Sequence, residues 1–63
     1  MTAEQFDNTE FGFGMLALYK DTEYFISEVD FEERLIAIRE IENSDDVSWK
    51  RCESITSVKF LNY

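Results

Sequence analysis

The sequence contains no histidine and no proline, and its only cysteine is Cys52. Without histidine, no imidazole can activate a serine or cysteine nucleophile, and the usual zinc-ligand combinations cannot form. A single cysteine excludes a disulfide within the chain and is typical of a reducing compartment. We therefore expect a protein of the cytoplasm that is not an enzyme and holds no metal ion or other cofactor.

Basic residues are also scarce, with six Lys and Arg against fourteen Asp and Glu, so the formal net charge is −8. Binding to DNA, RNA or anionic lipid depends on clusters of Lys and Arg. No uncharged apolar run approaches the ~20 residues that a bilayer requires. We expect no direct nucleic-acid binding and no membrane insertion. The acidic charge serves either solubility or the attraction of a protein partner with a basic cleft.

The chain has 63 residues, which is enough for one domain, and 44% of them are hydrophobic. A core of this size leaves only ~3–5 kcal/mol of stability, which natural miniature proteins supplement with a disulfide, a metal or a partner. We expect a monomer or weak dimer in which residues 12–63 form one small domain. Residues 1–11 are predicted to form an acidic arm. Thr2 and Gln5 match a capping box, so the arm is either a short helix or frayed.

The apolar segments predict up to five strands. Residues 12–20 and 23–30 form a hairpin in this interpretation, with its turn at Asp21 and Thr22. A second turn at 43–46 separates 34–42 from 47–53, and the last strand covers 57–61. Trp49 is expected in the core and not on a base-stacking surface. The strand segments contribute the other expected core residues: Leu16, Leu18, Ile26, Val29, Ile36, Ile38, Val58 and Phe60.

Two structures compete for residues 31–42. Asp30 and Glu33 could cap a helix whose apolar face carries Phe31, Leu35, Ile38 and Ile41, which gives an α+β fold. Alternatively, residues 34–39 are a short apolar strand bracketed by charge, and residues 31–33 are the bend before it. We favour the strand, which gives an all-β fold.

Five short strands with sharp turns and one apolar face each resemble the small SH3-like barrels. Residues 19–30, a hairpin that leads into an acidic bend, are similar to small phage-encoded proteins of that shape. This likeness implies a five-stranded barrel and carries no function by itself.

The tripeptide Glu53, Ser54 and Ile55 leads into an apolar segment and resembles a motif of the phage uracil-DNA glycosylase inhibitors. In that family the motif lies against the DNA-binding cleft of the enzyme. Acidic side chains replace DNA phosphates there, and an apolar pocket captures the leucine with which the enzyme probes the duplex. The resemblance implies that residues 53–55 are the docking element of a DNA-mimic inhibitor, active in the host cytoplasm. The alternative is a polar turn with Ile55 packed inward.

A mimic of DNA needs several carboxylates along one ridge. Glu28, Asp30, Glu32 and Glu33 are the expected ridge, with Glu53 at the docking segment. A second interpretation is an adaptor that binds a peptide or protein through the aromatic residues Tyr19, Tyr24 and Trp49. A third is a small Mg²⁺-dependent enzyme, in which a carboxylate pair such as Glu28 with Asp30, or Asp45 with Asp46, would hold the ion.

Overall fold

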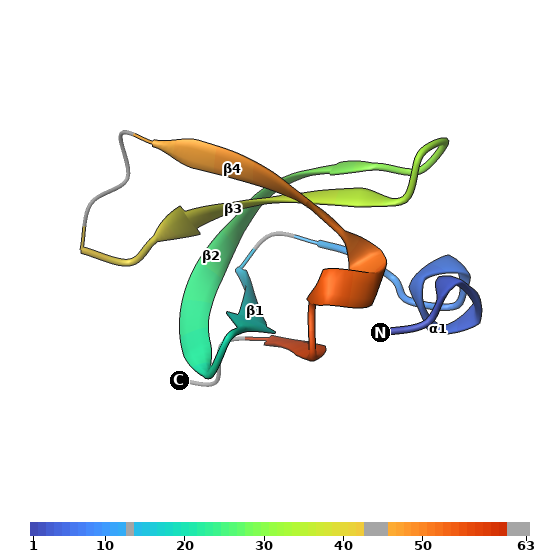
Figure 1. Ribbon diagram of the computed structural model, residues 1–63, viewed down its shortest axis with the longest axis horizontal. Coiled ribbons are helices and arrows are strands. Elements are labelled where there is room, and N and C mark those ends of the chain that lie inside the picture. The colour runs from blue at the N-terminus through green and yellow to red at the C-terminus, as the bar shows by residue number, and fades with distance from the viewer. Residues whose placement is uncertain (13, 43–45, 61–63) are drawn as a thin grey trace.

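The computed structural model describes residues 1–12, 14–42 and 46–60. Five antiparallel strands form one sheet in the order β4-β3-β2-β1-β5 (Figure 1). The prediction of an all-β fold of five strands is confirmed, and the sheet is consistent with a small barrel-like fold; a short helix precedes it. The elements in chain order are α1 (Ala3–Asp7), β1 (Met15–Tyr19), β2 (Thr22–Asp30), β3 (Leu35–Glu40), β4 (Val47–Arg51), the 3₁₀ turn η1 (Cys52–Ser54) and β5 (Ser57–Phe60).

The long strand β2 bends the sheet around the core. Its first half pairs with β1, and the strand then continues along β3 (Figure 1). The pairing register with β3 shifts between Ile26 and Glu28, which is a β-bulge. A bulge inserts one extra residue, so it reverses which face the following side chains take. Ile26 and Val29 therefore both pack against the core cluster, although strict alternation would place them on opposite faces.

The competition over residues 31–42 is resolved in favour of a strand, so the helix alternative is wrong. Leu35–Glu40 lies between β2 and β4 and pairs with both. Asp30 does not cap a helix: its Oδ1 accepts the backbone N–H groups of Glu32 and Glu33, at 2.9 and 3.1 Å, and so closes the turn into β3. The bend predicted at 31–33 is confirmed.

The β1–β2 turn lies one residue earlier than predicted, at Lys20 and Asp21. Both residues have positive φ angles, 49° and 63°, which is the requirement of a two-residue type I′ hairpin loop. Thr22 instead begins β2 and pairs with Tyr19. The second predicted turn falls mostly on residues 43–45, which lie outside the described residues.

The core is partly the one expected. Leu16, Ile36 and Ile38 are buried, whereas Leu18, Ile26, Val29 and Val58 are half-buried. Two expectations are wrong: Trp49 is 47% exposed and Phe60 is 53% exposed. Both belong to strands at the edges of the sheet. Ser48 and Lys50, on either side of Trp49 in β4, line a pocket on the inner face of the sheet. Because successive side chains of a strand point to opposite faces, Trp49 points to the outer face.

The N-terminal arm is part of the domain core. The capping box of α1 forms as predicted, with reciprocal hydrogen bonds between Thr2 and Gln5. Phe6 of this helix is only 1% exposed and joins Cys52 and Ile55 in the central apolar cluster. The backbone amino group of Met1 also donates to the carbonyl oxygens of Cys52 and Ile55. The helical alternative for the arm is therefore the one observed.

Candidate functional site

The predicted acidic ridge lies at the far end of the β2–β3 hairpin, at the upper right in Figure 1. We call residues 28–33 the hairpin tip. Glu28, Glu32 and Glu33 are exposed and Asp30 is half-buried. None of these four carboxylates forms an ion pair within the part of the chain that the structure describes. The tip thus gathers most of the predicted site residues with their charges unpaired.

An aromatic side chain lies at the centre of this acidic tip. Phe31 is 63% exposed, and its ring centroid is 5.8 Å from that of Phe6 and 6.0 Å from that of Phe11. Phe31 therefore rests on aromatic rings anchored in the core, and its outer face is open to solvent. Sequence reasoning assigned Phe31 to the bend and missed it as a contact residue. Beside it lies a shallow hollow of about 340 Å³, lined mainly by Phe11, Gly12, Ile26, Val29 and Phe31.

The two arginines nearest the tip are held by other acids. The Arg34 guanidinium donates two hydrogen bonds to Asp7, from Nε to Oδ1 at 2.9 Å and from the terminal nitrogen to Oδ2 at 2.8 Å. This hydrogen-bonded guanidinium lowers the pKa of Asp7, because it stabilises the ionised carboxylate. Arg51 lies 3.5 Å from Glu53. Since both arginines face acids outside the tip, the tip itself stays negative.

The Glu53-Ser54-Ile55 segment is not an exposed docking strand. Cys52 N–H donates to the carbonyl oxygen of Arg34 at 3.0 Å, which places η1 beside the turn between β2 and β3. Glu53 and Ser54 are exposed, but the Ile55 side chain is 0% exposed. The inward-packed alternative therefore holds for Ile55, whose side chain cannot reach a partner. A backbone hydrogen bond lowers the pKa of Glu53 and burial opposes it, while the charge of Arg51 and hydrogen bonds from Cys52 and Arg51 lower it further.

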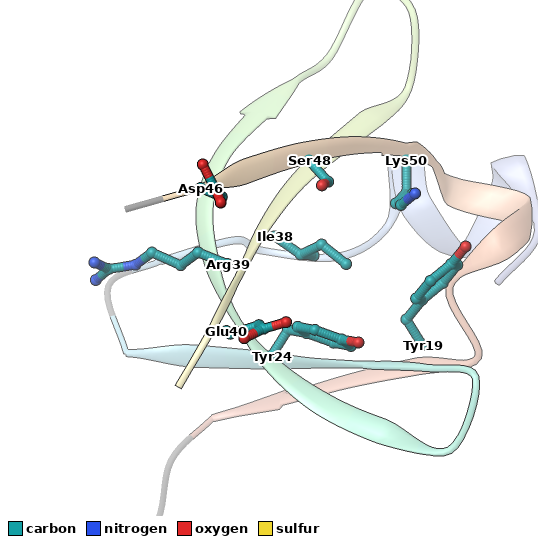
Figure 2. A pocket seen from close by; sticks show the side chains of 8 residues that line it. All are labelled: Tyr19, Tyr24, Ile38, Arg39, Glu40, Asp46, Ser48 and Lys50. Carbon is teal, nitrogen blue, oxygen red and sulfur yellow. The ribbon is translucent and has the colours of Figure 1, made fainter. Parts of the chain in front are cut away.

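A second candidate site is a pocket of about 190 Å³ at one end of the inner face of the sheet (Figure 2). Its residues come from four strands and the segment before β4, because alternate side chains of each strand face inward. Trp49 does not line it, so the three aromatic residues of the adaptor interpretation do not form one groove. The lining residues are Tyr19, Tyr24, Ile38, Arg39, Glu40, Asp46, Ser48 and Lys50.

Two lysine side chains approach the ring of Tyr19, and one of them, Lys50, lines the pocket. The Nζ atoms of Lys50 and Lys20 lie 5.0 and 5.4 Å from the centroid of the Tyr19 ring, within range of a cation–π interaction. The Tyr24 ring packs against it at 6.1 Å. Partial burial raises the pKa of the Tyr19 phenol, but the charges and hydrogen bonds of the two lysines outweigh burial and leave the pKa below its usual value.

The described residues offer little for metal or nucleophile chemistry. Among residues 1–12, 14–42 and 46–60, no group of three or more His, Cys, Asp or Glu could hold a metal ion. Of the proposed carboxylate pairs, Asp45 lies outside the described residues. Cys52 is buried, and burial together with the neighbouring charge of Glu53 raises the pKa of its thiol. Within the same ranges, no helix is long and apolar enough to cross a bilayer.

The chain was compared with protein-family models, curated proteins and solved structures, and none of them matches it.

Proposed function

We propose that this chain is a protein-binding module that docks its acidic hairpin tip into a basic cleft, and so competes with nucleic acid for that cleft as a DNA mimic. The proposal rests on the environment of the Phe31 side chain. Three exposed carboxylates, those of Glu28, Glu32 and Glu33, form no ion pair among the described residues and lie within three positions of Phe31 along the chain, and the Phe31 side chain is 63% exposed. Binding hot spots commonly combine a central aromatic anchor with charges that steer the encounter.

The rigidity of the tip supports this role. Asp30 fixes the turn by accepting two backbone hydrogen bonds, and Phe31 is held against the rings of Phe6 and Phe11. A surface that is already ordered loses little conformational entropy on binding, so more of its contact energy appears as affinity. The adjacent hollow could receive one apolar side chain of the partner next to Phe31.

The first target to test is uracil-DNA glycosylase, on the strength of the Glu53-Ser54-Ile55 resemblance. In this fold Glu53 and Ser54 reach solvent and Ile55 does not. The tip and Glu53 therefore make separable contributions. We expect the tip to carry affinity and Glu53, which already faces Arg51, to add less.

The experiment measures uracil excision from a labelled duplex by a bacterial uracil-DNA glycosylase as the concentration of this protein rises. Phe31→Ala should weaken inhibition at least ~10-fold, as expected when a hot-spot aromatic residue is truncated. The double variant Glu32→Gln and Glu33→Gln should slow association and flatten the dependence of inhibition on salt. Double-stranded DNA should compete with the inhibitor.

A matched control removes two charges at the opposite end of the hairpin. Asp21→Asn with Glu42→Gln makes the same change in net charge, and both positions are exposed. This control should inhibit like the wild type. Full excision at a large excess of folded wild-type protein would eliminate the glycosylase as target. Equal losses in the tip and control variants would show that net charge alone acts, and that the tip does not.

The adaptor interpretation has weaker support in the geometry, because Tyr19 and Tyr24 share a pocket while Trp49 faces away from it. The dependence of binding on salt concentration distinguishes the two functions. Binding through the acidic tip should fall steeply as ionic strength rises, whereas an aromatic peptide groove should respond much less.

A further inference from the structure

The pocket described above has two ends of opposite charge. Figure 2 shows Lys50 and Tyr19 at one side, Asp46 and Glu40 at the other, and Ser48 between them. The order acid, hydroxyl, ammonium runs from the residue before β4 along the inner face of that strand, because 46, 48 and 50 are alternate positions. Ile38 lies between the two ends and separates them with an apolar side chain.

The positive end has no counter-ion within the described residues. Three of the bases, Arg34, Arg51 and Lys59, form ion pairs with carboxylates. Lys20 and Lys50 form none there and instead approach the ring of one tyrosine from 5.4 and 5.0 Å. Two ammonium groups at one ring repel each other, and an anion bound near Lys50 would offset that repulsion. The chain as a whole has a net charge of −8, so two basic side chains beside one ring are unusual for it.

The carboxylates at the negative end also lack ion-pair partners among the described residues. Glu40 and Asp46 form no ion pair within the described ranges, and the Arg39 side chain points out of the pocket in Figure 2. Arg39 packs over Phe25 on the outer face instead, with 5.4 Å between its guanidinium carbon and the ring centroid. Figure 2 shows Asp46 at the upper edge of the pocket and Glu40 at its lower edge beside Tyr24, so this side offers a cation two separate carboxylates.

We propose that this pocket binds a small zwitterion whose two charges are separated by an alkyl chain, with its anionic group at Lys50 and Tyr19 and its cationic group at Glu40, on the acidic side that also carries Asp46. A volume of about 190 Å³ lies below the ~300–1,000 Å³ of pockets for drug-sized ligands, so nucleotides and larger cofactors do not fit. The Cα atoms of Asp46 and Lys50 are roughly 13 Å apart along an extended strand. The ligand's two charges must therefore be separated by a chain, and a compact zwitterion such as glycine would not reach both ends.

The probe is 6-aminohexanoate, whose amino and carboxylate groups are joined by a flexible alkyl chain. Two-dimensional NMR of the labelled full chain should show saturable shifts at Tyr24, Ser48 and Lys50, with a dissociation constant of ~1 mM as expected for few contacts. Hexanoate and hexylamine each carry one of the two charges, and glycine carries both side by side. All three should bind about 10-fold more weakly, because each loses one charged contact.

Variants at the two ends test the orientation. Lys50→Gln should reduce 6-aminohexanoate affinity ~10-fold and leave hexylamine binding unchanged, and Glu40→Gln should spare hexanoate binding instead. Lys59→Gln and Glu42→Gln are the matched controls, since they remove the same charges outside the pocket. Lys20→Gln, on the exposed turn, supplies a second test of the positive end if Lys50→Gln does not fold.

Three results would overturn the proposal. The first is the absence of saturable shifts with 6-aminohexanoate at ~10 mM, well above the expected dissociation constant. The second is hexanoate or hexylamine binding as tightly as the zwitterion. The third is an affinity for 6-aminohexanoate that Glu40→Gln leaves unchanged. Glycosylase inhibition and Phe31 play no part in these measurements, so this proposal and the tip proposal stand or fall separately.

Discussion

At the scale of single residues, a few isolated apolar side chains hold the ends of the chain to the sheet. Phe6, Cys52 and Ile55 each lie in a polar segment, and each is at most 1% exposed. They meet Ile36 in one cluster. Since the domain is so small, each of these side chains accounts for a large part of the core.

Ile55→Ala should lower the free energy of unfolding by ~2–5 kcal/mol, because it leaves a cavity in a fully buried site. For a domain of this size, that loss approaches global unfolding. Urea titration followed by tryptophan fluorescence measures it. Ile41→Ala, at a site that is 48% exposed, is the matched control and should change stability little. An unmoved midpoint in Ile55→Ala would contradict the inward packing of this residue.

The Asp7–Arg34 pair predicts a pH dependence at the acidic end. The pKa of Asp7 is lowered in the folded chain, chiefly by its hydrogen bonds to Arg34. The contribution to stability is therefore complete above the unfolded pKa of Asp and is lost as pH falls through the lowered folded value. Asp7→Asn should melt below the wild type near neutral pH, and the difference should shrink in acid. A difference that grew as pH fell would contradict the pair.

At the scale of elements, two local features set the course of the sheet. Strand β2 pairs with β1 through residues 22–25 and with β3 through residues 24–30, and the bulge between Ile26 and Glu28 shifts the register of the second pairing. The two-residue turn at Lys20 and Asp21 fixes the register of the first hairpin, with Tyr19 opposite Thr22. Neither turn residue is glycine, although both occupy the left-handed region that glycine tolerates best.

Asp21→Gly should therefore stabilise the domain by ~0.5–1 kcal/mol, because it relieves the left-handed backbone strain. Asp21→Ala, with a Cβ and no side chain that can hydrogen-bond locally, should destabilise the domain at the same position. Thermal melts of the two variants against the wild type give the comparison. If both changes shifted the melting temperature in the same direction, the type I′ assignment of this turn would be wrong.

At the scale of the whole molecule, the charge is unevenly distributed. Within the described residues, the acids of the hairpin tip form no ion pair, while Lys20 and Lys50 both approach the ring of Tyr19. A net charge of −8 on 63 residues also repels itself in the compact state, and this repulsion costs stability.

Raising NaCl from low to physiological ionic strength and above should therefore increase the melting temperature, because salt screens the repulsion between exposed carboxylates. Differential scanning calorimetry at constant pH measures it. Quadruple charge removal by Glu28→Gln, Glu32→Gln, Glu33→Gln and Glu42→Gln should reduce the salt effect. A melting temperature that fell with salt would mean that the ion pairs outweigh the repulsion.

Reductant and chelator should leave the melting temperature unchanged, since Cys52 is the only cysteine in the sequence and no metal site was expected.

The sequence by itself indicated a mainly β fold, because short apolar segments between turn residues favour strands, but the tertiary structure decided between strand and helix at 31–42. The sequence also placed the capping box of α1 and the acidic character of residues 28–33. Tertiary structure decided the rest. Ile55 became a core residue and Trp49 a surface residue because burial depends on which element covers a face. Phe31 became an exposed aromatic anchor, and Lys50 met Tyr19 and Glu40 in one pocket, because strand pairing joins positions that no local pattern connects.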